Sequence, residues 1–110
     1  MTIGVRILKA WPSFSGWYYG IKGENGWEAT LSQANRDLWD ELDEIAFRYK
    51  KDGTITGPTD DADFNCNYFV TSKFMRLMPA IIGDLILNYR NVPIVREIIS
   101  IYSLIQGGAQ

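Results

Sequence analysis

The stretch WYYGIKGENGWEATL, residues 17–31, contains the turn whose register decides the fold predicted for this chain. A two-residue loop at Asn25 and Gly26 would put Lys22 on the same strand face as Leu31, which buries a charge. A three-residue loop over residues 24–26, with Gly26 as the left-handed residue of a bulge, avoids this conflict. We therefore expect a β-hairpin with these residues facing inward: Trp17, Tyr19, Ile21, Trp27, Ala29 and Leu31. Its outward face would carry Tyr18, Lys22, Glu28 and Thr30, with Lys22 opposite Glu28.

The composition indicates a folded globular protein. The chain has 110 residues, of which 46% are hydrophobic and 14% aromatic, which suits a single domain with a substantial core. The single cysteine, Cys66, excludes an internal disulfide and fits a reducing compartment. No signal peptide is recognisable at the N-terminus, so we expect a cytoplasmic protein.

Histidine is absent from the sequence, and this lowers the expectation of catalysis. The commonest general base and the commonest metal ligand are both missing. Asp61, Asp63 and Asn65 match the first three ligand positions of a calcium-binding EF-hand loop, but Cys66 and Ser72 stand where that loop needs glycine and glutamate. We expect no enzyme activity, no cofactor and no metal site.

The N-terminal third resembles a small sheet in its periodicity. Residues 2–10 alternate between apolar and other side chains, which favours a strand, and residues 11–16 contain the proline and glycine of a connection. With the hairpin, residues 1–31 would form three strands. Residues 68–71 could add a fourth.

The rest of the chain favours helices. Leu38, Leu42, Ile45 and Tyr49 recur at helical spacing and predict an acidic helix over residues 32–51. Residues 52–67 are expected to form a loop, with a short strand possible at 54–56. Residues 72–106 are an apolar helical region, in which Pro79 and Pro93 suit the first turns of two helices. Whether the first of these helices starts earlier, with Pro79 as a kink, the sequence leaves open. The fold class predicted is therefore α+β, with an antiparallel sheet of three to four strands packed against about three helices in one domain.

Charge is unevenly distributed along the chain. Residues 24–63 contain eleven acidic and four basic side chains, a net charge of −7, whereas the flanking regions are basic. This imbalance favours a basic protein partner and disfavours direct binding to nucleic acid or to an anionic membrane.

The candidate partner-binding site lies on the predicted acidic helix. At helical spacing, Asp40, Asp43, Glu44 and Phe47 fall opposite the apolar stripe, where an aromatic ring is unexpected unless it anchors a partner. Asp60, Asp61 and Asp63 would form a rim. The competing interpretation is that another element covers Phe47 and that the acids are simply solvated. We interpret the chain as a non-catalytic acidic binding module that blocks a basic surface, by analogy of physical profile with inhibitor or immunity proteins that neutralise toxin nucleases.

Two other functions remain open. The apolar C-terminal helices cover more than one helical face, so the chain could be an assembly subunit that forms a homo-oligomer through them. The aromatic residues near Tyr18 could instead bind a carbohydrate or another small ligand.

Overall fold

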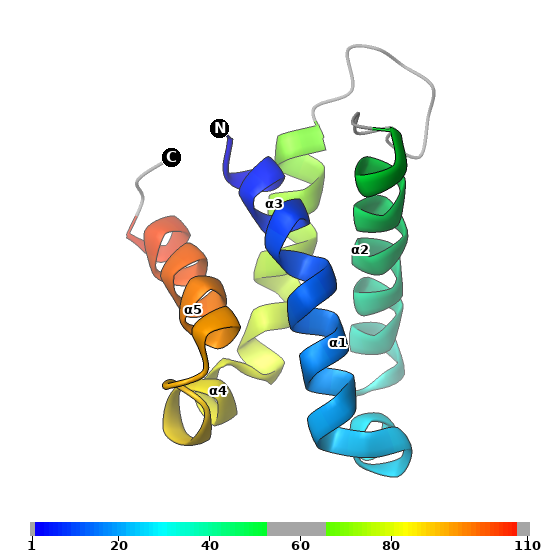
Figure 1. Cartoon of the computed structure of the whole chain (residues 1–110), viewed down its shortest axis with the longest axis vertical. Coiled ribbons are helices and arrows are strands. Elements are labelled where there is room, and N and C mark those ends of the chain that lie inside the picture. The colour runs from blue at the N-terminus through cyan, green and yellow to red at the C-terminus, as the bar shows by residue number, and fades with distance from the viewer. Residues whose placement is uncertain (1, 53–65, 108–110) are drawn as a thin grey trace.

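The structure, a computed structural model, contains helices and no strands in the part of the chain that it describes. It describes residues 2–52 and 66–107, without the side chains of residues 24–30, 51, 52 and 66. Figure 1 shows the helices and one short 3-10 turn: α1 (Ile3–Thr30), α2 (Gln33–Asp52), α3 (Cys66–Leu77), η1 (Met78–Ala80), α4 (Ile82–Asn88) and α5 (Pro93–Gln106).

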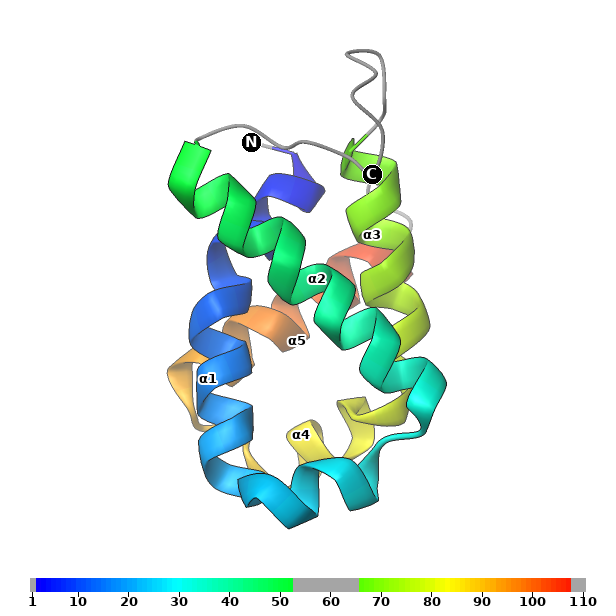
Figure 2. The ribbon, with the colours of Figure 1, turned by 90° about the vertical axis from the view of Figure 1, so that its right-hand side faces the viewer.

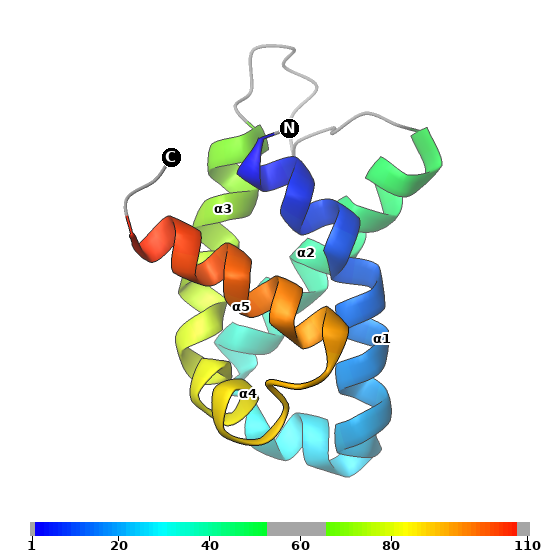
Figure 3. The same cartoon turned by 60° about the vertical axis from the view of Figure 1, so that its left-hand side comes forward.

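Helix α1 is the centre of the bundle. It packs against α2, α3 and α5, and α2 also packs against α3. Helices α1 and α3 run in one direction along the molecule, whereas α2 and α5 run back (Figure 1). Figure 3 shows α5 lying obliquely across α1 and α3, with α4 at the end of the bundle from which α5 starts.

The predicted α+β class is wrong, because no strand occurs in the described residues. In the region predicted to be rich in strands, residues 1–31, the structure instead forms α1 over Ile3–Thr30. Ile7, Trp11, Phe14 and Tyr18 recur at steps of four, three and four, and all four are buried. This is the same helical spacing that predicts the acidic helix, but the dense run of aromatic residues also fits strand alternation over short windows.

The hairpin predicted for residues 17–31 is also wrong. Some side chains that it places outward are buried, and some that it places inward are exposed. Tyr18, placed outward in that prediction, is 1% exposed, whereas Tyr19 and Ile21, placed inward, are each 49% exposed. The left-handed backbone lies at Gly23, with φ of 69°, and not at Gly26. There α1 changes direction and continues as helix to Thr30 across the end of the molecule (Figure 2).

The acidic helix is confirmed. Helix α2 begins after Ser32, whose side-chain Oγ accepts a hydrogen bond from the Asn35 backbone N–H at 3.2 Å. Leu38, Leu42 and Ile45 are buried, as their spacing predicts.

The C-terminal region agrees in part with its prediction. Pro93 opens α5 as expected. Pro79, by contrast, lies in η1, which separates α3 from α4. The strand proposed at 68–71 is a turn of α3, and the strand proposed at 54–56 lies outside the described residues.

An aromatic cluster joins α1 to α2 in the core. The Trp39 ring of α2 lies 4.9 Å from both the Trp11 and Tyr18 rings and 5.7 Å from the Phe14 ring, measured between centroids. Such tilted ring pairs add to the free energy gained by burying their large apolar surfaces. The cluster fixes α2 against α1 and thereby decides which face of α2 remains outside.

Candidate functional site

The outer face of α2 carries the predicted partner-binding residues. Phe47 is 67% exposed, and Asp40 and Glu44 are exposed beside it. Asp43 is partly buried, because its side chain is directed toward α1. The predicted rim residues Asp60, Asp61 and Asp63 lie outside the described residues.

Two acids on this helix are neutralised by basic side chains of the same chain. Glu44 Oε1 lies 2.6 Å from Arg48 Nη2, one helical turn away, and Glu41 Oε2 lies 2.5 Å from Lys73 Nζ of α3. Asp40 forms no ion pair in the part of the chain that the structure describes. Among the predicted partner-binding residues of α2, the negative charge that no described ion pair offsets therefore lies on Asp40 and Asp43. This charge is smaller than the sequence alone indicates.

A short polar network holds Asp43. The Trp11 indole N–H donates to Asp43 Oδ1 at 2.7 Å, and the Ser15 hydroxyl donates to the same carboxylate. The Trp39 indole N–H in turn donates to Ser15 Oγ at 2.9 Å. Two tryptophans of the buried aromatic cluster thus satisfy their only polar groups through this network.

Burial raises the pKa of the Asp43 carboxyl group above its ordinary value of 3.8. The hydrogen bonds from Ser15 and Trp11 stabilise the charged form and oppose this rise, while the negative charge of Asp40 adds to it. Burial is the largest of these effects. The ionised carboxylate is therefore incompletely compensated by its neutral donors.

A hollow of about 220 Å³ lies beside this network, between α1 and α2. We name it the Asp43 pocket and define it by its lining residues: Trp11, Pro12, Ser15, Asp43, Ala46, Phe47 and Lys50. Pro12, Phe47 and Lys50 are exposed at its mouth, whereas Trp11 is fully buried and Asp43 partly so. The pocket is thus lined by aromatic and apolar side chains, one carboxylate and the ammonium group of Lys50.

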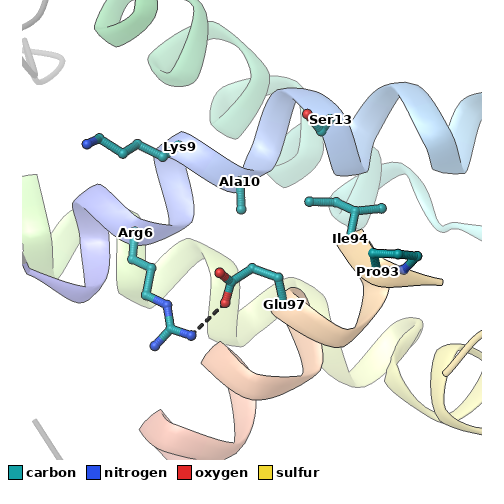
Figure 4. A pocket seen from close by; sticks show the side chains of 7 residues that line it. All are labelled: Arg6, Lys9, Ala10, Ser13, Pro93, Ile94 and Glu97. Carbon is teal, nitrogen blue, oxygen red and sulfur yellow. Dashed lines mark hydrogen bonds and ion pairs between the residues drawn. The ribbon is translucent and has the colours of Figure 1, made fainter. Parts of the chain in front are cut away.

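A larger groove of about 750 Å³ lies between α1 and α5 (Figure 4). Ala10, Pro93 and Ile94 give it an apolar lining, and Arg6 and Lys9 give it basic groups. Arg6 Nη2 is paired with Glu97 Oε1 at 2.6 Å across the two helices. None of the predicted acidic residues lines this groove.

A third hollow, of about 450 Å³, lies between α1, α3 and α5 and is lined by Ile3, Asn67, Tyr68, Thr71, Ser72, Met75 and Ile105. Its lining carries hydroxyl and amide groups but no charged side chain. It therefore offers no counter-ion for a charged ligand.

The structure also bears on the predicted small-ligand site near Tyr18, on metal binding and on membrane spans. Tyr18 is buried against Trp39, so its ring cannot present a face to a sugar. In the described residues, no group of three or more acidic or cysteine side chains is placed to hold a metal ion. None of the described helices is both long and apolar enough to cross a membrane.

Sequence reasoning missed the contribution of α1 to the site. Trp11, Pro12 and Ser15 lie more than 25 residues before Asp43, in a segment that was expected to be a connection. The missed signal is the spacing of Trp11 from Ile7 and Phe14, which places residues 11–15 on a helix beside α2.

Comparison with family models, with curated proteins and with solved structures finds no match for this chain. The function has to be argued from the geometry of the chain itself.

Proposed function

We propose that this chain is a non-catalytic binding module that docks a basic protein on the outer face of α2, with Phe47 as the anchoring side chain. The observation that supports this most directly is the 67% exposure of Phe47 on a helix whose other large apolar residues face the core. Aromatic side chains at the centre of an interface commonly contribute a large share of the binding free energy.

Phe47 differs from other exposed apolar residues in its surroundings. Leu87 of α4 is 80% exposed, but it lines none of the hollows described above. Tyr68 of α3 is 71% exposed and lines the third hollow, but that lining contains no charged side chain. Phe47 borders the Asp43 pocket and lies on the same helix face as the exposed carboxylate of Asp40. This combination of an aromatic anchor with adjacent negative charge suits a basic protein surface. An inhibitor that covers the substrate groove of a nuclease is one function of this kind.

The test compares partners captured by the wild-type chain, by Phe47→Ala and by Leu87→Ala. We expect a protein of basic isoelectric point to be captured by the wild type and by Leu87→Ala, and to be released by high salt. Calorimetry with that purified protein should show Phe47→Ala binding about tenfold more weakly or worse.

The matched variant Leu87→Ala removes an even more exposed apolar side chain elsewhere on the molecule. If Phe47→Ala and Leu87→Ala bind the purified partner as the wild type does, the outer face of α2 is not the interface. If the captured partner is acidic and its binding is insensitive to salt, the electrostatic part of the proposal is wrong.

A further inference from the structure

The Asp43 pocket has the composition of a site for one cationic side chain. Its lining combines the partly buried Asp43 with the exposed Phe47 and Pro12. We propose that this pocket binds the guanidinium group of a single arginine side chain of the partner, with Asp43 as its counter-ion and Phe47 as its stacking surface. The inference rests on the proposed function, because it specifies the chemistry that the partner presents to the same face.

The neutral hydrogen-bond partners of Asp43 favour a cation in the pocket. The two groups that hydrogen-bond to Asp43, the Trp11 indole and the Ser15 hydroxyl, are both neutral. Among the described residues, no basic side chain forms an ion pair with Asp43. An ionised carboxylate can accept about four hydrogen bonds, so acceptor positions remain for an entering donor. A cation that enters the pocket would therefore compensate a partly buried charge that the neutral donors Trp11 and Ser15 compensate only in part.

The size of the pocket limits the occupant to one side chain. Its volume of about 220 Å³ is below the roughly 300–1,000 Å³ that is typical of pockets for drug-sized molecules. A side chain that projects from a surface lying over α2 would reach Asp43 past Phe47.

Arginine suits these walls better than lysine does. Its guanidinium is flat, stacks on aromatic rings and is less strongly hydrated than an ammonium group. It also presents several N–H donors in one plane, which matches the remaining acceptor positions of a carboxylate. Lysine would bring its charge to Asp43 but would gain less from the Phe47 ring.

Lys50 lines the mouth of the pocket and opposes entry of a cation. It forms no ion pair with Asp43 in the described part of the chain, so it does not already act as the counter-ion. Removal of its charge should therefore tighten arginine binding. A purely structural role of the pocket would not produce this effect.

The experiment is an NMR titration of the full chain with a capped tripeptide that has arginine at its centre. We expect the Trp11 indole N–H resonance to shift and to saturate, because this N–H donates to Asp43. The Trp17 indole is the internal control, because its ring packs against Tyr89, away from the pocket. A second tripeptide with citrulline, the neutral counterpart of arginine, should leave the Trp11 resonance in place.

Three variants make the titration specific. Asp43→Asn should weaken binding of the arginine tripeptide about tenfold or more, because its amide still accepts from Trp11 but carries no charge. Asp40→Asn removes an exposed charge on the same face and should weaken binding by less than about fivefold. Lys50→Gln should strengthen binding by up to about fivefold.

The inference is overturned if the arginine tripeptide leaves the Trp11 resonance unchanged or if citrulline shifts it equally. It is also overturned if Asp43→Asn titrates as the wild type does. These failures differ from failure of the proposed function. A partner that loses affinity for Phe47→Ala but not for Asp43→Asn would dock on α2 without placing arginine in the pocket.

Discussion

Asp43 lies in the candidate site, and its ionised form lowers the stability of the fold relative to its protonated form. Its carboxylate is partly buried, and burial raises its pKa above 3.8. The folded protein therefore holds the Asp43 proton to higher pH than the unfolded chain does. The contribution of Asp43 to stability is greatest below pH 3.8 and is lost as the pH rises through the raised pKa. At neutral pH the residue is retained at the expense of stability, as is common in functional sites.

We expect Asp43→Asn to raise the free energy of unfolding at neutral pH, by up to about 1 kcal/mol, because the amide oxygen still accepts from Trp11 and no charge is buried. Denaturant unfolding of both proteins over a range of pH checks this. The advantage of the variant should shrink as the pH falls toward 3.8. A variant that is much less stable at neutral pH would show instead that the charged form is well compensated in the fold.

Gly4 is required by a close approach between α1 and α3. Its backbone N–H donates to Asn67 Oδ1 at 2.6 Å, and a Cβ at this position would lie 2.8 Å from Asn67 Cα. We expect Gly4→Ala to lower the free energy of unfolding by about 1–3 kcal/mol, because the two helices would have to separate.

The matched control is Gly16→Ala in the same helix. Gly16 is exposed, and a Cβ there would meet no atom of the described residues within 4 Å. Alanine has the higher helix propensity, so this variant should gain about 0.5–1 kcal/mol. Equal effects of the two substitutions, measured by denaturant unfolding, would contradict the close approach at Gly4.

At the scale of helices, an ion pair fixes the bend of α1 to α4. Lys22, next to the left-handed Gly23, places its Nζ 2.8 Å from Asp84 Oδ2. This hydrogen bond raises the pKa of Lys22 and lowers the pKa of Asp84. Asp84 also lies in the first turn of α4, where a negative charge is favourable. The pair links the bend of α1 to α4, which lies about sixty residues later in the sequence.

We expect Asp84→Asn to lower the free energy of unfolding by less than about 1 kcal/mol at neutral pH, since both side chains reach water. The folded-state pKa of Asp84 is lowered, so its stabilising effect is present above pH 3.8 and is lost as the pH falls through the lowered value. The difference between wild type and variant should therefore vanish in acid. A difference that persists at low pH would mean that the side chain acts through packing or through its hydrogen bond with Asn88.

The sequence predicts helices well where only one periodicity is present. Leu38, Leu42 and Ile45 fit a helix and no strand, and α2 was predicted to within a residue at either end. In α1, aromatic residues follow one another so closely that their positions fit both the spacing of a helix and the alternation of a strand. Pro12 and Gly16 also indicate a connection between two elements in the sequence. In the structure both are exposed residues in the middle of α1. A local pattern cannot decide between these periods, because the choice depends on the packing of Trp11 against Trp39.

The candidate site could be predicted only in part for the same reason. The outward placement of Phe47 follows from the periodicity of α2 alone, and the structure agrees with it. The hydrogen bond from Trp11 to Asp43 joins residues on two helices, so no spacing within the sequence indicates it. The neutralisation of Glu41 by Lys73 is likewise a contact between helices and could not be anticipated.

For the molecule as a whole, the structure accounts for most of the apolar residues near the C-terminus. Val95, Ile98, Ile101 and Ile105 of α5 are buried in the core, where α5 packs against α1 and α4. The apolar side chains that α4 and α5 leave exposed are Ile86, Leu87 and Leu104. This is a modest amount of apolar surface compared with that of a stable homodimer interface, which buries roughly 1,200 Å² or more in total.

We expect the purified chain to be monomeric, because the apolar face of α5 is already buried within the bundle. Light scattering at increasing protein concentration should give the mass of one chain throughout. The double variant Leu87→Lys, Leu104→Lys is the control, and it should leave both the mass and the helical circular dichroism spectrum unchanged, since the two side chains lie at the surface. A wild-type dimer that this double variant dissociates would instead favour an assembly subunit that associates through its C-terminal helices. In that outcome Phe47→Ala should leave the dimer intact, which separates self-association from binding of a basic partner on α2.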